Sequence, residues 1–195
     1  MDEGYIKFNI DHSFEEILIP DHIFNLLNIW RTRLFDLNLI GETSDGIGFG
    51  NISVKTKNGF FITGSATGKN KVLNKNDYAF VYKYYLSENK VFSRGMCKAS
   101  SESMSHAAVY ESYEKINSVI HIHSEIMWKK YYNFLPTTSE SAAFGTPEMA
   151  KEIKKILIQP DVLNNGIIIM GGHEDGIITF GNKLDDAGKI LMKFI

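Results

Sequence analysis

The spacing of apolar residues changes along the chain from a helical to a strand period. After residues 20–21, apolar side chains recur every three or four positions, which predicts an amphipathic helix that ends near Leu39. Beyond a glycine-rich loop at residues 46–50, residues 52–56 alternate between apolar and polar, which is the period of a strand. The apolar positions of the helix are Ile23, Leu26, Leu27, Trp30, Leu34 and Leu37.

Turn signals predict two hairpins in the next part of the chain. The Asn-Gly pair at residues 58–59 is a strong hairpin signal, so residues 60–63 are predicted to return beside the preceding strand. Residues 79–86 and 90–94 are predicted to form a second hairpin around the turn at residues 87–89.

Helices and strands also alternate in the second half of the chain. Thr146 is a good N-cap and Pro147 suits the first helical position, so a helix is predicted to begin there. The other predicted elements are helices at about 101–115, through Trp128 and from 184 to the end, and strands at 118–123, 167–170 and 177–180. Hairpins mixed with helices predict a single α/β domain over residues 1–195, a sandwich around a central, largely antiparallel sheet.

Composition places the chain among ordinary globular proteins. It has 195 residues, 44% of them hydrophobic and 23% charged, which is enough for one domain with a full core. A net charge of −2 without a basic stripe argues against nucleic-acid binding. The single cysteine, Cys97, excludes an internal disulfide, fits a reducing compartment and is predicted to be a packing residue. The acidic N-terminus is unlike a signal peptide and no apolar run could span a bilayer, so we expect a soluble, cytoplasmic protein without membrane contact.

Two histidines end an apolar run that is typical of a strand. Residues i and i+2 of a strand share a face, so His121 and His123 are predicted to point one way while Ile120 and Ile122 point into a core. Two imidazoles on one rigid face are a ready pair of metal ligands. His173 lies fifty residues further, in a glycine-flanked turn, and the three histidines with the acid Glu102 are a plausible set of Zn²⁺ ligands. A structural or surface pair of histidines is the alternative interpretation.

An acidic residue precedes these histidines by nineteen positions. Glu102 opens a predicted helix, where Ser101 would be the N-cap and the carboxylate would favour the positive end of the helix dipole. That structural role is sufficient by itself. Alternatively, a helix N-terminus with Ser100 and Ser101 binds an anion, and Glu102 acts as a base beside a metal. His106, one turn further, is predicted to pack or to support a ligand rather than to bind metal.

Residues 64–69 superficially resemble a phosphate-binding P-loop. Only three residues separate the two glycines, and Asn70 stands where a serine or threonine would hold Mg²⁺, so an NTPase is excluded. A loop rich in glycine and hydroxyl groups still offers backbone N–H groups to a phosphate or carboxylate. A plain connecting turn is the alternative.

Six short motifs occur in a particular order. They are Gly48-Phe49-Gly50-Asn51-Ile52-Ser53, Phe61-Ile62-Thr63-Gly64-Ser65, Ser100-Ser101-Glu102 with His106 and Tyr110, Val119-Ile120-His121-Ile122-His123-Ser124, Phe144-Gly145-Thr146-Pro147-Glu148, and the His173 turn. In this order, and with the spacing from Glu102 to His121, they resemble the class II aldolase/adducin family over about residues 22–190.

The resemblance implies a fold, a cofactor and a set of site residues. The fold is a single α/β domain with a central antiparallel sheet flanked by helices, assembled as a homotetramer. The cofactor is a divalent metal, most commonly Zn²⁺, held by His121, His123 and His173. Glu102 is implied to be a metal ligand or the catalytic acid/base. The residues implied to form a phosphate pocket are Asn51, Ser65, Ala66, Ser100 and Ser101.

Members of this family cleave or epimerise sugar phosphates, and some dehydrate ketose phosphates. We therefore expect a metal-dependent lyase of the aldolase type, acting on a small phosphorylated hydroxy-carbonyl compound. The substrate would chelate the metal, which stabilises an enediolate, while Glu102 moves a proton at the neighbouring carbon. The alternatives are a sugar-phosphate 4-epimerase or dehydratase, a non-catalytic adducin-like interaction module, and a purely structural metal site.

Several positions depart from the family pattern. Gly64 replaces a proline and Ala66 a glycine. Glu174 and Asp175 follow the third histidine, where they are rivals to Glu102 as the acid/base. The chain ends soon after its last strand, so a C-terminal segment that supplies a catalytic tyrosine in the family's aldolases is expected to be missing. Aromatic residues that follow the histidine strand are predicted to pack at a subunit interface or, equally, in the domain's own core: Trp128, Tyr131, Tyr132 and Phe134.

Overall fold

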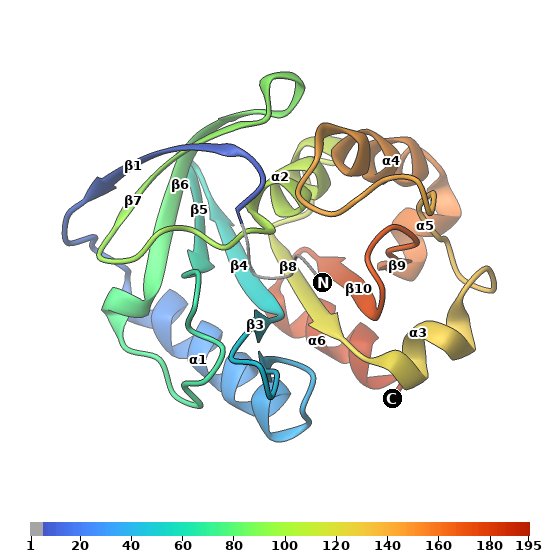
Figure 1. Cartoon of the computed structure of the whole chain (residues 1–195), viewed down its shortest axis with the longest axis horizontal. Helices are drawn as coiled ribbons and strands as arrows, with labels where there is room; N and C mark the ends of the chain where they lie inside the picture. The colour runs from blue at the N-terminus through green and yellow to red at the C-terminus, as the bar shows by residue number, and fades with distance from the viewer. Residues whose placement is uncertain (1–5) are drawn as a thin grey trace.

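An eight-stranded sheet forms the centre of this computed structural model, which describes residues 6–195 (Figure 1). The acidic N-terminal segment, residues 1–4, on which the prediction of no signal peptide rests, lies outside the described residues. The strand order is β1-β7-β6-β5-β4-β8-β10-β9. All neighbouring strands are antiparallel except β1 and β7, which are parallel, so the predicted α/β fold with a largely antiparallel sheet is confirmed.

The strands are short, and three pairs of successive strands, β4–β5, β6–β7 and β9–β10, are joined by short turns. Those of the large sheet are β1 (Asn9–Phe14), β4 (Asn51–Thr56), β5 (Gly59–Thr63), β6 (Tyr78–Tyr85), β7 (Lys90–Gly95), β8 (Ser118–His123), β9 (Ile167–Ile169) and β10 (Gly176–Gly181). A separate ribbon pairs β2 (Gly41–Glu42) with β3 (Gly48–Phe49). Both predicted hairpins are present, β4 with β5 and β6 with β7.

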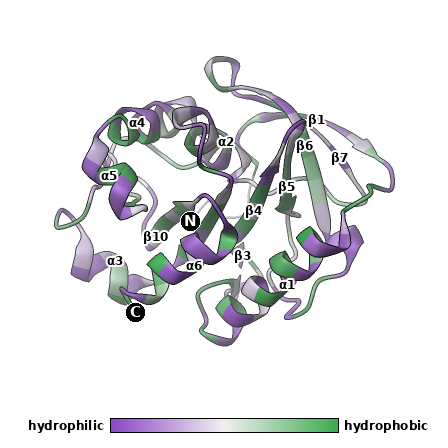
Figure 2. Ribbon diagram, turned by 180° about the vertical axis from the view of Figure 1, so that it is seen from behind, coloured by the Kyte–Doolittle hydropathy of each residue, from purple (hydrophilic) through white to green (hydrophobic). Residues whose placement is uncertain are grey.

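Helices cover both faces of the sheet. On one face α1 (Asp21–Asp36) and α6 (Leu184–Met192) lie side by side, with apolar and polar residues interleaved along each of them (Figure 2). On the other face α2 (Ser103–Ser112) packs against α4 (Pro147–Leu157). The remaining helices are α3 (Glu125–Tyr131), α5 (Pro160–Asn165) and the short 3-10 turns η1 (Lys75–Asp77) and η2 (Leu86–Glu88). None of the described helices has both the length and the hydropathy to cross a membrane.

The alternation of side chains along β8 divides the apolar core into two parts. Ile120 and Ile122 are buried in the cluster that includes Leu27 of α1, as the sequence predicts. Val119 is buried in the other cluster, with Met104 of α2. Since residues two apart share a face of a strand, His121 and His123 lie on the α2 side of the sheet.

Some elements were not predicted from the sequence pattern. β1 is polar and largely exposed at the edge of the sheet, so it lacks the alternation that marks a half-buried strand. α2 runs over Ser103–Ser112 rather than 101–115. α1 stops at Asp36 instead of near Leu39, and Asn38 follows with a left-handed φ of 55° that cannot continue the helix.

Candidate metal and anion site

The three predicted histidines converge. His121 and His123 project from one face of β8, and His173 comes from the turn between β9 and β10. One ring nitrogen of each lies within 4.8 Å of one ring nitrogen of the others. The Nε2 atoms of His121 and His123 are 3.2 Å apart. Three imidazole nitrogens at this spacing can surround one divalent cation, since Zn²⁺ takes histidine nitrogens at about 2.0–2.1 Å.

Two glycines let the His173 turn reach this position. A Cβ atom on Gly171 would lie 2.1 Å from the carbonyl oxygen of Thr138, and one on Gly172 would lie 1.9 Å from that of Ala142. Both distances are far below van der Waals contact, so only glycine fits at either position. The close approach brings the turn against the 138–142 segment and carries His173 to the histidine pair.

His121 is held in the form that binds a metal. Its Nδ1–H donates to the carbonyl oxygen of Ile177 at 3.2 Å, which leaves the lone pair on Nε2, the atom that faces His123. Burial, followed by the neighbouring His123 and His173, keeps the pKa of His121 well below its ordinary value. The imidazole is therefore neutral at physiological pH, as a metal ligand must be.

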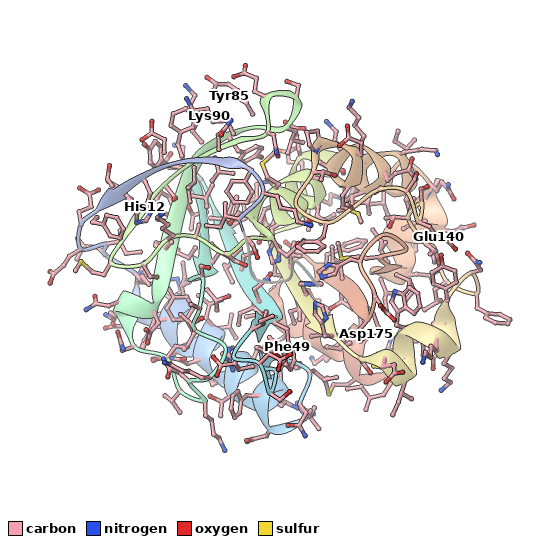
Figure 3. The ribbon with its side chains drawn as sticks, in the orientation of Figure 1. His12, Phe49, Tyr85, Lys90, Glu140 and Asp175 are labelled. Carbon is pink, nitrogen blue, oxygen red and sulfur yellow. The ribbon has the colours of Figure 1, made fainter. Side chains whose placement is uncertain are left out.

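Aromatic rings enclose the histidines. Phe144 stacks on His173 with ring centroids 4.3 Å apart, and Phe49 lies 5.7 Å from His123. Figure 3 shows Phe49 and Asp175 on either side of the end of β8 that carries the histidines. These rings restrict the rotation of two of the three imidazoles. The ring of Phe144 in turn lies under the Nζ atom of Lys7 at 3.6 Å.

Glu102 is buried beside the histidines. The residue is 2% exposed, and its Oε1 atom lies 4.0 Å from Nδ1 of His173. Ser101 was predicted to be the N-cap of α2, and this prediction is wrong. Glu102 occupies the N-cap position without capping through its side chain, and its N–H donates to Oγ of Ser100 at 3.3 Å. The carboxylate is therefore directed at the histidine cluster and not used to cap the helix.

A buried hydroxyl network lies beneath the site. Oγ of Ser53 is 2.6 Å from both Nδ1 of His106 and the hydroxyl of Tyr110. His106 is fully buried and is not among the three clustered histidines, in agreement with a packing or supporting role. The sequence does not predict this role of Ser53, because nothing in the sequence of a strand indicates which helix a hydroxyl on it will contact.

We expect acid to destabilise the protein through His106. Burial lowers the pKa of His106 from 6.5 to about 3, so between these values the unfolded chain binds a proton that the folded protein does not. Stability is therefore full above pH 6.5 and falls as the pH decreases, by about 2 kcal/mol between pH 7 and 5 from one such group. Urea unfolding measured across this range should show the loss. His106→Gln should show a smaller one, and an equal loss in the variant would contradict this assignment.

Every residue predicted for the phosphate pocket lines one cavity. The cavity has a volume of about 330 Å³ and adjoins the histidines, because Asn51 on β4 stands directly opposite His121 on β8. Asn51 is 6% exposed and its Oδ1 atom has no hydrogen-bond partner among the described residues. The lining residues are Asp45, Gly46, Ile47, Gly48, Phe49, Gly50, Asn51, Gly64, Ser65, Ala66, Thr67, Gly68, Ser100 and Ser101.

The 64–68 loop has the features of an anion-binding turn. Ala66 adopts a left-handed φ of 60°, which is unusual for a residue with a side chain. Within the described part of the chain, the backbone N–H groups of Ala66, Thr67 and Gly68 donate no hydrogen bond. Consecutive N–H groups of this kind bind phosphates and carboxylates. Asp45 is the one charged side chain in the described cavity lining, so a bound anion would rely on neutral donors there.

The two rival acids, Glu174 and Asp175, are less buried than Glu102. Glu174 is exposed, and both Glu174 and Asp175 raise the pKa of Lys129 on α3, after the larger effect of Glu125. The carbonyl oxygen of Asp175 accepts a hydrogen bond from the N–H of Ser124 at 2.9 Å. Both charges therefore act on Lys129 of α3.

The chain matches one family model but no curated protein. The model of the Class II Aldolase and Adducin N-terminal domain matches residues 41–193. No curated protein matches the sequence at a significant level.

Solved structures of similar fold share little sequence with the chain. L-fuculose-1-phosphate aldolase from Thermus thermophilus is 20% identical with a TM-score of 0.61, and covers 88% of this chain and 85% of its own. A further L-fuculose 1-phosphate aldolase is 19% identical with a TM-score of 0.68, covering 90% and 82%. YgbL from Klebsiella pneumoniae, a candidate aldolase, epimerase or decarboxylase, is 14% identical with a TM-score of 0.67, covering 91% and 86%. At these identities the likeness shows the fold alone. Since the family match spans more than half of the chain, the protein belongs to the class II aldolase and adducin N-terminal domain family.

Proposed function

We propose that this protein is a metal-dependent lyase of the aldolase type that acts on a small phosphorylated hydroxy-carbonyl compound. The observation that supports the proposal most is that three imidazoles and a buried carboxylate, Glu102, lie beside a cavity lined by hydroxyl and amide groups. A metal-dependent aldol cleavage needs a Lewis acid, a proton-transfer group and a substrate-binding site. The histidines with their metal, Glu102 and the cavity would supply these in turn.

His121, His123 and His173 would hold the metal. Histidine nitrogens are a donor set that Zn²⁺ prefers, and three protein ligands leave a position open for substrate. The chemistry that the metal supplies when bound is Lewis acidity, which polarises a carbonyl and favours negative charge on a neighbouring oxygen. An open position of this kind argues against a purely structural metal.

Glu102 would transfer the proton at the carbon next to the carbonyl. Buried and 4.0 Å from His173, the carboxylate is within reach of a substrate that sits between the histidines and the cavity. Ser100 and Ser101, which line the cavity, immediately precede it in the chain. The phosphate group of the substrate would therefore be held next to the group that moves the proton.

Asn51 and the 64–68 loop would orient the phosphate. Asn51 offers an amide group from the strand opposite His121, and the loop offers the N–H groups of Ala66, Thr67 and Gly68. Ser65 and Ser101 add hydroxyl groups from two sides of the same cavity. Phosphates are commonly bound by such neutral donors together with helix N-termini.

An assay of aldehyde release tests the proposal. The zinc-loaded protein is incubated with a panel of ketose phosphates, and the aldehyde is measured by coupling to an NADH-dependent reductase. We expect release that is abolished by EDTA. Interconversion of epimers without cleavage would favour the 4-epimerase alternative. Absence of turnover with every substrate and every divalent metal would favour a non-catalytic interaction module.

The proposal includes assembly as a homotetramer, which the family resemblance implies. Light scattering of the purified protein would measure the oligomeric state. Three of the aromatic residues named for an interface pack partly against the protein's own core. Trp128 donates from Nε1 to the carbonyl oxygen of Met170 at 2.9 Å, and Tyr131 packs edge-on against Phe194. Phe134 is 85% exposed, which makes it the most accessible of the four to a neighbouring subunit.

A further inference from the structure

A buried arginine lies behind the 64–68 loop. Arg31 projects from α1, outside the residues that match the family model, and is 1% exposed. Its Nη2 atom donates to the carbonyl oxygens of Gly68 at 2.9 Å and Thr67 at 3.4 Å. Its Nη1 atom is buried and has no hydrogen-bond partner within the described residues.

The charge of Arg31 is not balanced by an acid. Among the ion pairs of the described residues, none involves Arg31. Burial lowers its pKa to about 10, so the guanidinium still carries its charge at neutral pH. Removing a cation from water is costly, and the two carbonyl oxygens offset only part of that cost because they carry no full negative charge.

The contacts of Arg31 orient two peptide groups. In a trans peptide the C=O and the following N–H point in opposite directions. Because the carbonyl groups of Thr67 and Gly68 face the guanidinium, the N–H groups of Gly68 and Lys69 point away from it. Thr67 and Gly68 line the anion cavity, whose described lining contains no lysine or arginine. The Thr67–Gly68 peptide group beside the cavity therefore has a buried cation on its carbonyl side.

Close packing holds the 64–68 loop in this orientation. A Cβ atom on Gly68 would lie 2.1 Å from the carbonyl oxygen of Gly41 and 2.8 Å from Cα of Gly48, so the loop is held tightly against the β2–β3 ribbon. The hydroxyl of Thr67 donates to the carbonyl oxygen of Gly64 at 2.8 Å and closes the turn. A shift of the Arg31 side chain would therefore displace the backbone of the 64–68 loop.

We propose that Arg31 is a positioning residue that braces the 64–68 loop and supplies, from behind it, the positive charge that draws a phosphate group into the cavity. The proposal rests on the proposed function, since it assumes that the cavity takes the phosphate of the substrate. In this proposal the positive charge of the phosphate site comes from Arg31 on α1, whereas the groups that contact the phosphate are neutral.

Calorimetric titration with inorganic phosphate tests the assignment. Arg31→Met should weaken the dissociation constant for phosphate about tenfold, because it removes one unit of charge close to a dianion. Arg31→Lys keeps the charge and should recover most of the affinity, which a purely structural role would not predict. The matched control is Arg33→Met, which removes an exposed charge from the same helix and should change the affinity less than about twofold. Each titration is made on the zinc-loaded protein and repeated after EDTA, so that phosphate bound at the metal is recognised.

The outcomes separate this proposal from the proposed function. If the wild type binds no phosphate after EDTA, the phosphate cavity and the role of Arg31 are both overturned. If the wild type binds phosphate and Arg31→Met binds it equally well, the role of Arg31 alone is overturned. If Arg31→Lys is as weak as Arg31→Met, the charge assignment fails.

A measurement on the wild type covers the case in which Arg31→Met does not fold. Phosphate should shift the amide resonances of Gly68 and Lys69 and the side-chain N–H resonance of Arg31, while that of Arg33 stays in place. Unshifted Gly68 and Arg31 resonances at saturating phosphate would overturn the proposal.

Discussion

Replacing Glu102 with Gln is expected to leave the fold and the bound metal intact and to lower turnover about 10²–10⁴-fold, the usual effect of losing a positioned acid/base. The reason is position, since the buried carboxylate lies 4.0 Å from Nδ1 of His173 and makes no side-chain cap to α2. Losing the favourable interaction of this charge with the helix dipole would change the free energy of unfolding by only about 0.3–1 kcal/mol. Steady-state turnover, zinc content and urea unfolding of the same preparation distinguish the two effects.

Glu174→Gln and Asp175→Asn are the controls for this prediction. Both residues act on Lys129 at the α3 side of the turn, so each variant should keep turnover within about threefold of the wild type. An active Glu102→Gln enzyme together with an inactive Glu174→Gln or Asp175→Asn enzyme would move the acid/base to the His173 turn.

Replacing His173 with Ala is expected to remove the metal. Loss of a residue that only supports a ligand weakens metal binding about 10–100-fold, and loss of a direct ligand should weaken it by about 100-fold or more. His173 is the best ligand to change, since it lies on a turn, whereas His121 is enclosed in the sheet. Competition with a chromophoric chelator gives the zinc dissociation constant, and turnover should fall with metal occupancy.

His22→Ala is the matched control, because His22 is an exposed histidine on α1. Its zinc affinity should equal that of the wild type. A His173→Ala protein that retains zinc with unchanged affinity would show that the three imidazoles do not form one metal site, and the proposed lyase mechanism would lose its Lewis acid.

The parts of the fold that the sequence predicted are those with strong local signals. The Asn-Gly turn at residues 58–59 joins β4 to β5, where a Cβ on Gly59 would lie 2.1 Å from the carbonyl oxygen of Val81. Thr146 caps α4 through the N–H of Met149, with Pro147 in the first turn. Such turns and caps depend on a few neighbouring residues, so a single sequence is enough to find them.

The helix that carries Glu102 shows how a local signal can mislead. Ser101 has the chemistry of an N-cap, but the helix begins two residues later, at Ser103. Ser100 accepts the N–H of Glu102 instead, and the carboxylate turns toward His173. Local propensity allowed several starting points for this helix, and burial of Glu102 beside the site favoured one of them.

The sequence by itself determined which residues could form the site. Strand periodicity placed His121 and His123 on one face, and the glycines before His173 indicated a tight turn. It could not determine that His173 and Glu102 meet, nor that Arg31 lies behind the anion cavity, because these contacts join residues far apart in the chain. Only the tertiary structure decided them, since packing of α1, α2 and the β9–β10 turn against one sheet fixes which distant side chains share a space.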